Sequence, residues 1–502
     1  MPDQGSAAQA AKEPVPDQDI SPQGQDIDKQ EQSPGQVTRM GTARVGRLVR
    51  EFAIPSIVMF VVNGLYNIID AIFMGFGVGP LGQATATIAV PIMIVGMAIS
   101  MLIGAGGNAL MAIRLGEGRH EDAEKVMGNA FTLTVIVAVA MTVLATVFID
   151  PLLKLCSATP DTLPMCRTFV HIIALGFIVQ FFAGAFSNFI RTAGDPNRAL
   201  YTMVSGTAVC ILLNALLVLG LHMGVAGSAI ATISGQTVSA VQIFYYFVFS
   251  KKAPFHLRLH WLRLKPRLVR DIMALGSSSF LLQAANVVIN VVVNSQLAGL
   301  GAGTPVGPEG ALASIGVVNR IAMFTFFPVI GVAVGSSPLF GYNYGAGKFD
   351  RVKRAYLVAL LWTAVIGVVF FILIRVMPGP IVGAFNLTGN LRDFAAGALQ
   401  VQTFLIIVSG VQVVGSNLFQ STGQPLKSIF LSLTRQFLYL VPLVFLMPLL
   451  LPHIMPGLLP LDGVYWAFPI ADFLSLVTAG LMMLREFRRL SRMQKAGVKV
   501  ER

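Results

Sequence analysis

Charged residues are scarce in this chain: Asp, Glu, Lys and Arg together make up 12% of its 502 residues. Soluble domains carry roughly 25%, and hydrophobic residues here reach 55%. This composition excludes an ordinary soluble protein and indicates a chain that lies in the lipid bilayer. The net charge of +12 can then reflect membrane topology, so no nucleic-acid partner is expected.

Motifs for catalysis are also missing. A GxxxxGK[ST] phosphate loop ending at Lys348 would need glycine at 342 and Ser or Thr at 349, where the chain has Tyr342 and Phe349. The six histidines are scattered, and no nucleophile lies beside a base. We therefore expect neither an enzyme nor a direct user of ATP, and no cofactor.

Cysteines are few. Cys156 and Cys166 flank a predicted external loop, and Cys210 lies within a span. A disulfide between the first two is one alternative on an oxidising side of the membrane, and two unrelated thiols are the other. The sequence leaves both open.

Long apolar stretches are what the chain has in abundance. Segments of about 20 residues, enough to cross a bilayer, lie near 52–75, 86–112, 127–149, 164–187, 199–220, 226–249, 272–299, 311–341, 354–377, 395–419, 428–450 and 462–485. The sequence therefore predicts an all-α membrane protein with twelve transmembrane helices.

The two halves of the chain are related. NFIRTAGDP at Asn188–Pro196 and NLFQSTGQP at Asn417–Pro425 lie 229 residues apart, and LGEGRHEDAEKV from Leu115 has its counterpart YGAGKFDRVKRA from Tyr344 at the same offset. Two matches at one offset indicate an internal repeat of six helices. Because six is even, the repeats have the same orientation, and an axis along the membrane normal relates them.

Positive charge divides the two sides of the membrane. Of 36 Lys and Arg residues, only Lys154, Arg167, Arg375 and Arg392 lie at one set of helix ends. The positive-inside rule places the other side, with both termini, in the cytoplasm. We expect a disordered cytoplasmic tail at 1–40, an N-lobe at 41–250 (TM1–TM6), a basic cytoplasmic linker at 251–270, a C-lobe at 271–487 (TM7–TM12) and a basic cytoplasmic tail at 488–502.

An acid within the first span is the leading functional candidate. Asn63, Asn67 and Asp70 are spaced i, i+4, i+7 and share one helix face, and Asn214 in span five lies at comparable depth. Since a charge in hydrocarbon is costly, these residues form a predicted proton or cation site. The alternative is that Asp70 only caps the outer end of its helix in contact with water.

The second half has other polar groups. A stripe along span seven contains Gln283, Asn286, Asn290 and Asn294, which either bind a substrate or join helices. Arg320 in span eight and Asp472 in span twelve lie at matching depth, which predicts an ion pair. The candidate substrate cavity comprises Gln283, Asn286, Asn290, Met323 and Phe324.

Several segments together resemble the multidrug and toxic compound extrusion (MATE) family, and its DinF-like bacterial branch in particular. They are NGLYNIIDAIFMGFGVGPLG at Asn63–Gly82, GEGRHEDA at Gly116–Ala123, RTAGDP at Arg191–Pro196, GVAGSAIAT at Gly224–Thr232 and GYNYGAGKFDRVKRA at Gly341–Ala355. The resemblance implies a V-shaped pair of six-helix lobes in the bacterial inner membrane. It also implies an antiporter, here expected as a monomer, that exchanges drugs and organic cations for H⁺ or Na⁺.

The resemblance assigns the site residue by residue. Asp70 matches the family's acid in the first helix, and Asn214 matches the Asn of an NxxxD pattern whose Asp is replaced by Val218. The family's two-carboxylate cation site is thus incomplete, which leaves H⁺ or Na⁺ as alternatives at Asp70. Two other functions remain open: a flippase of a lipid-linked precursor, and a membrane scaffold or sensor that transports nothing.

Overall fold

The computed structural model describes residues 35–497, apart from 157, 158, 161, 302–306, 386 and 388. Residues 1–34 of the tail predicted at 1–40, and the residues after 497, lie outside this range. Throughout the described residues the secondary structure is helical, with no strand, which confirms the all-α prediction.

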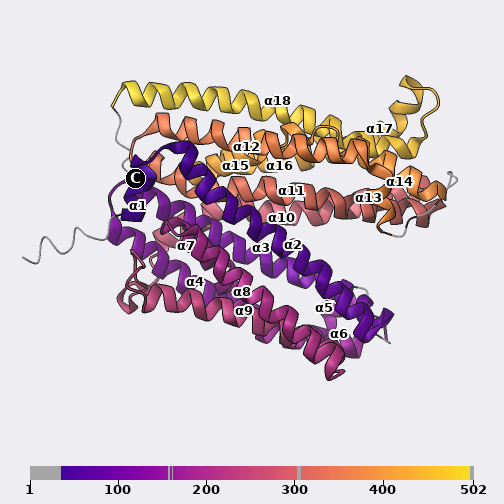
Figure 1. The fold of residues 1–502 in the computed structure, drawn as a ribbon, viewed down its shortest axis with the longest axis horizontal. Coiled ribbons are helices and arrows are strands. Elements are labelled where there is room, and N and C mark those ends of the chain that lie inside the picture. The colour runs from indigo at the N-terminus through magenta and orange to yellow at the C-terminus, as the bar shows by residue number, and fades with distance from the viewer. Residues whose placement is uncertain are drawn as a thin grey trace, which may run out of the picture. The chain divides into compact units, whose positions relative to one another are not determined.

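Each repeat forms one lobe (Figure 1). The N-lobe helices are α2 (Val45–Val78), α3 (Pro80–Gly116), α4 (His120–Val147), α5 (Ile149–Leu155), α6 (Leu163–Leu175), α7 (Phe177–Thr192), α8 (Pro196–Asn214) with the π turn η1 (Ala215–Gly220), and α9 (Gly224–Val248). The C-lobe helices are α10 (Pro266–Gly301), α11 (Gly307–Gly345), α12 (Phe349–Val376), α13 (Pro378–Gly383), α14 (Gly389–Gln402), α15 (Gly410–Ser421), α16 (Pro425–Leu433) with the π turn η4 (Thr434–Leu440), α17 (Val441–Ile454) and α18 (Pro460–Lys495). Short 3₁₀ turns are η2 (Leu259–Leu262) and η3 (Ile406–Val408).

The number of membrane spans remains a prediction. Within the described residues, ten helical segments are long and apolar enough to cross a bilayer, and α6 with α7, bent by 54°, makes up to eleven. The 25-residue helix α9 occupies the remaining predicted position but is not among these segments. The two-repeat helical architecture is therefore confirmed, whereas the count of twelve is not.

Residues related by the 229-residue repeat meet where the lobes touch. Asn108 Nδ2 donates to Ser337 Oγ at 3.5 Å, and these two residues are themselves 229 apart. Thr192 donates to Asn108, and the equivalent pair in the other repeat, Ser421 and Ser337, is hydrogen-bonded at 2.7 Å. Each repeat thus makes the same hydrogen bond at equivalent positions, and the two bonds meet at Asn108 and Ser337. This arrangement indicates a local two-fold axis between the repeats.

Two repeat-related glycines permit the closest approach of α3 and α11. A Cβ on Gly116 would lie 2.0 Å from the carbonyl oxygen of Tyr342, and one on Gly345 would lie 2.2 Å from that of Ile113. No side chain fits at such distances. The first glycine of each repeated segment, GEG and GAG, is therefore required by the contact between the lobes.

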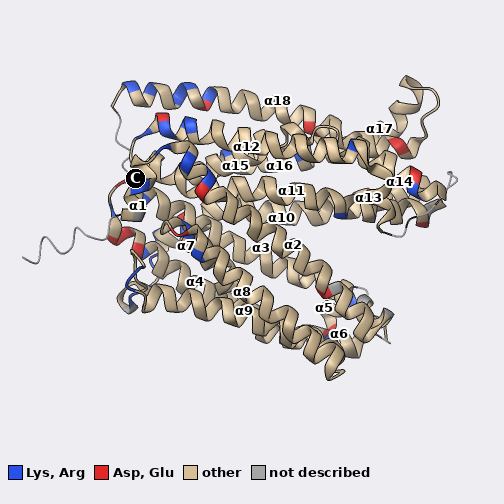
Figure 2. Cartoon of the chain, in the orientation of Figure 1, with Lys and Arg blue, Asp and Glu red and all other residues tan. Residues whose placement is uncertain are grey.

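The contacts between lobes run along part of each helix. On α2 and α11 they extend from Phe52 with Gly335 to Gly64 with Phe327. Figure 2 shows Lys and Arg gathered at the end of the molecule where α18 terminates. The lobes therefore touch in the half of the molecule that carries most of the positive charge.

A short helix overlaps the end of the tail predicted at 1–40. Residues Gly35–Thr42 form α1, with the side chains of Val37 and Met40 buried. Arg351 Nη2 donates to the carbonyl of Ala43 at 2.6 Å, and Lys348 Nζ donates to that of Gly41 at 2.9 Å. Cationic side chains thus satisfy carbonyls at the end of this helix.

The predicted linker and C-terminal tail are also partly structured. Between α9 and α10 the chain packs on α4, where Thr132 Oγ1 donates to the carbonyl of Leu262 at 2.7 Å and Asn129 Oδ1 accepts from the Lys265 amide at 2.7 Å. Helix α18 continues through the predicted boundary at 487 to Lys495. Part of the predicted linker thus packs against α4, and part of the predicted C-terminal tail continues α18.

Candidate functional site: a carboxylate between three N-lobe helices

Asp70 lies where α2, α8 and α9 meet. Its Oδ1 accepts hydrogen bonds from Asn214 Nδ2 at 3.2 Å and from Ser228 Oγ at 3.0 Å. Because α2 continues to Val78, two turns beyond Asp70, the geometry does not match the alternative of a carboxylate that caps the helix end. The side chain is instead held between helices by donors on both neighbours.

Each of the three helices contributes two polar side chains four residues apart, which places them on one helical face. The pairs are Tyr66 and Asp70 on α2, Cys210 and Asn214 on α8, and Ser228 and Thr232 on α9. Tyr66 Oη and Thr232 Oγ1 are 2.9 Å apart, and Cys210 Sγ lies 3.4 Å from Tyr66 Oη. The carboxylate therefore belongs to a continuous polar network inside an apolar lobe.

The predicted neighbours on α2 lie elsewhere. Asn67 Nδ2 donates to the backbone carbonyl of Asn63 at 2.7 Å and lies 3.4 Å from its Oδ1. Among the described residues, neither amide forms a hydrogen bond with Asp70. The structure thus brings Asn214 to Asp70, as predicted from depth, and leaves Asn63 and Asn67 bonded to each other.

Four members of the network were not predicted: Tyr66, Cys210, Ser228 and Thr232. Ser228 and Thr232 lie in the GVAGSAIAT segment that carries part of the family resemblance. The available signal was the same in every case, a polar pair at i, i+4 within an apolar span. That signal identifies a polar face on each helix but cannot show which faces meet.

The position of the absent second acid is filled by packing. Val218 is fully buried, and a Cβ on Gly77 would lie 2.3 Å from Val218 Cγ1. The Oδ1 atom of Asn214 is buried and, in the described part of the chain, has no hydrogen-bond partner. The site therefore offers one carboxylate and one amide oxygen without a described partner.

The predicted ion pair between Arg320 and Asp472 is wrong. Asp472 Oδ1 pairs with Arg435 Nε at 2.5 Å, and both side chains are largely buried. Arg435 belongs to the π turn η4, which packs against α18, whereas Arg320 is exposed on α11. Arg320 and Asp472 were matched by their depth along their helices, but depth does not show which side chains meet.

The amide stripe of α10 divides between two roles. Asn286 Oδ1 accepts from Gln436 Nε2 at 3.1 Å and so joins α10 to η4, while its Nδ2 lies 3.5 Å from Gln283 Oε1. Asn290 Nδ2 donates to the carbonyl of Asn286 at 2.8 Å, and its side chain is exposed, as is that of Asn294. One end of the stripe joins helices, and the other is open.

The predicted apolar cavity residues and the cysteines also have defined places. Met323 is 56% exposed, and Phe324 packs edge-on against Phe327, with ring centroids 5.8 Å apart. Cys156 and Cys166 are free thiols. Within the described residues, no group of three or more His, Cys, Asp or Glu side chains could hold a metal ion.

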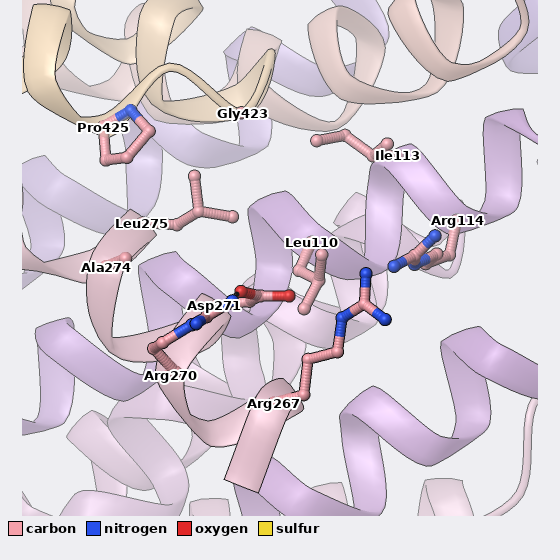
Figure 3. A pocket seen from close by; sticks show the side chains of 10 residues that line it. All are labelled: Leu110, Ile113, Arg114, Arg267, Arg270, Asp271, Ala274, Leu275, Gly423 and Pro425. Carbon is pink, nitrogen blue, oxygen red and sulfur yellow. Dashed lines mark ion pairs between the residues drawn. The ribbon is translucent and has the colours of Figure 1, made fainter. Parts of the chain in front are cut away.

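A cavity of about 260 Å³ lies at the basic end, between α3, α10 and the turn before α16. Its lining residues are Leu110, Ile113, Arg114, Arg267, Arg270, Asp271, Ala274, Leu275, Gly423 and Pro425 (Figure 3). Arg114 also pairs with Glu117 at 3.0 Å. This cavity lies at the contact between the lobes and includes none of the predicted site residues.

Comparison with known proteins gives consistent results. The family model MatE matches residues 55–216 and 279–446, one segment in each repeat. Multidrug export protein MepA of Staphylococcus haemolyticus (strain JCSC1435) is 24% identical over 430 residues, covering 85% of this chain and 90% of that protein. MepA of Staphylococcus aureus (strain MSSA476) is 22% identical over 441 residues, covering 88% and 93%.

A solved structure shares the fold. A multidrug resistance MATE family transporter of the MOP superfamily, in an outward-facing conformation, superimposes with a TM-score of 0.85 over 92% of this chain and 100% of its own. Its sequence is 22% identical, so the likeness concerns the fold alone.

Proposed function

This chain belongs to the MatE family of multidrug efflux transporters, and we propose that it works as an antiporter that exports lipophilic and cationic compounds in exchange for H⁺. The proposal places it in the bacterial inner membrane as a monomer with both termini in the cytoplasm. The relatives named multidrug export protein and the one-sided distribution of Lys and Arg support this assignment.

The observation that carries the proposal is the environment of Asp70. Its carboxylate receives hydrogen bonds from Asn214 and Ser228 and, within the described residues, forms no ion pair. A charge within a membrane span is costly, so a carboxylate there without a counter-ion is a candidate functional site. A proton bound there and a cationic substrate nearby oppose each other electrostatically, and exchange requires reciprocal coupling of this kind.

The ligand set favours H⁺ over Na⁺. Sodium is a hard cation that, by analogy with Ca²⁺ and Mg²⁺, requires several oxygen ligands, and the position of a second acid is occupied by buried Val218. A proton needs only one carboxylate oxygen. The buried Oδ1 of Asn214 is a suitable acceptor for the hydrogen of a protonated Asp70.

Alternating access is supported by the contact between the lobes. This contact lies in the basic half of the molecule, which the positive-inside rule assigns to the cytoplasm. In the proposed cycle the described state is closed to the cytoplasm. Substrate enters after these glycine-lined contacts separate.

The test is dye efflux from proteoliposomes with a pH gradient and a Na⁺ gradient imposed separately. We expect the pH gradient to drive efflux of cationic dyes by the wild type and not by Asp70→Asn. Failure of either gradient to drive any dye would refute antiport. A flippase is disfavoured because a pyrophosphate group needs several cationic side chains, and Arg435 is already neutralised by Asp472.

A further inference from the structure

Arg320 occupies an unusual position for a charged residue. It lies 13 residues from the start of the 39-residue helix α11, about 20 Å along the axis. Its side chain is exposed and forms no ion pair or hydrogen bond with any described residue. A cation within a span requires water, a counter-ion or a ligand.

Neighbouring contacts show which way Arg320 points. Phe327, seven residues further along α11, touches α2, where a Cβ on Gly64 would lie 2.3 Å from its ring. Seven residues make about two turns, so Arg320 is on the same face as Phe327. That face is directed at the N-lobe rather than at lipid.

The open amides of α10 share this orientation. Gly276 contacts α3, since its Cβ would lie 1.7 Å from the Leu102 carbonyl oxygen. Asn290 and Asn294 follow 14 and 18 residues later, about four and five turns, and continue the same face. Asn290 lies 11 residues from the end of α10, or about 16 Å, close to the depth of Arg320 on the adjacent helix.

Among the described residues of α3, the face opposite this surface carries no acid. The face of α3 that begins with Leu102 continues outward through Val95 and Pro91, both exposed. Asp70 is turned into the N-lobe toward Asn214 and Ser228. By the 229-residue offset, Pro91 is the counterpart of Arg320, so the charge occurs in one repeat only.

We propose that Arg320, Asn290 and Asn294 form a substrate-binding surface for one anionic group, a carboxylate or sulfonate, on an otherwise lipophilic compound. This assignment rests on the proposed export function and specifies its substrate class. A guanidinium binds a carboxylate through two parallel hydrogen bonds, and the adjacent amides add neutral donors. The single positive charge of Arg320 matches the single negative charge of a carboxylate or sulfonate. A zwitterionic compound should therefore bind more tightly than a purely cationic compound of the same size.

The test uses two dyes that differ at one group. Rhodamine 110 carries a free carboxylate, and rhodamine 123 is its methyl ester. Binding to the purified full-length chain in lipid nanodiscs is measured by fluorescence anisotropy without an ion gradient. We expect the wild type to bind rhodamine 110 more tightly than rhodamine 123, and equal or weaker binding of rhodamine 110 overturns the proposal without any variant.

Variants then assign the preference to Arg320. We expect Arg320→Met to weaken rhodamine 110 about tenfold, the loss typical of one charge-assisted contact, with rhodamine 123 changed less than twofold. Arg320→Lys keeps the charge and should retain most of the preference. Asn290→Ala should weaken rhodamine 110 about threefold. Equal effects of Arg320→Met on both dyes would assign the residue a structural role.

Failure of this proposal is distinguishable from failure of antiport. The binding comparison involves no gradient and leaves Asp70 unchanged. Gradient-driven efflux that depends on Asp70, together with no preference for rhodamine 110, would reject the anion surface alone. A clear preference without gradient-driven efflux would reject antiport alone.

Discussion

The two lobes have one architecture and different chemistry. In the N-lobe an unpaired carboxylate, Asp70, receives two neutral hydrogen bonds. In the C-lobe Asp472 is neutralised by Arg435, and Arg320 is a cation within a span that forms no ion pair with any described residue. Residues that the repeats share include Gly116 and Gly345 at the junction of the lobes. The duplicated scaffold therefore serves two unlike polar sites.

Corresponding irregular segments show the same difference. Both lobes contain a π turn within their fifth span, η1 after Asn214 and η4 around Arg435. Such turns frequently occur at functional sites. In the N-lobe the turn follows the amide that binds the carboxylate, whereas in the C-lobe it carries a buried ion pair. The Asp70 carboxylate has no charged partner among the described residues, whereas the charges of Arg435 and Asp472 neutralise each other.

The largest expected effect comes from removing the N-lobe charge. Asp70→Asn keeps the shape of the side chain but cannot titrate, so pH-driven efflux should fall to background while expression and thermal unfolding stay near wild type. Proteoliposome transport measures this effect. Ser228→Ala is the matched control, since it removes one hydrogen bond and keeps the carboxylate, and it should lower the rate only a few-fold. Full activity of Asp70→Asn would shift coupling to the C-lobe.

The ion pair between Arg435 and Asp472 should contribute to the free energy of unfolding. Asp472→Leu strands a buried guanidinium and should destabilise the protein by about 3–5 kcal/mol, whereas adding Arg435→Met should recover much of that loss. Denaturation in detergent measures the coupling. Arg320→Met combined with Asp472→Leu should be additive within about 0.5 kcal/mol, and strong coupling in that pair would contradict the observed partners.

Alanine at the shared junction should affect both repeats alike. Gly116→Ala and Gly345→Ala each push a methyl group into a backbone carbonyl, and overpacking of this kind costs about 1–3 kcal/mol. The two losses should agree because the contacts are reciprocal. Gly299→Ala is the control, with open space around its Cβ, and should not destabilise. Thermal unfolding of the three variants makes the comparison, and unequal losses would argue against a symmetric junction.

The smallest effect is expected from restoring the second acid. Val218→Asp places a carboxylate near Asn214 and should increase the Na⁺ dependence of efflux a few-fold, because hard cations prefer charged oxygen ligands. Parallel Na⁺ and pH gradients measure the change. Val218→Asn, similar in size and uncharged, is the control. No difference between the two variants would mean that residue 218 does not face the cation.

Much of the fold was predictable because it depends on properties that run along the chain. Apolar length located the helices, and the 229-residue offset identified the repeat. Asp70 and Asn214 were identified because a polar residue in an apolar span is conspicuous. Ser228 and Thr232 were not, since hydroxyl groups are common in membrane helices, where they bond to the preceding turn.

The amino-acid sequence alone determined that the chain lies in a lipid bilayer and that its helices form two repeats. It also determined the depth and angular position of each polar side chain on its own helix. The tertiary structure decided which faces meet: Ser228 with Asp70, Arg435 with Asp472, and Arg320 with no described partner. Helical periodicity sets directions only relative to one helix axis. The rotation of each helix against its neighbours depends on packing across the bundle, such as the fit of glycine to carbonyl between α3 and α11.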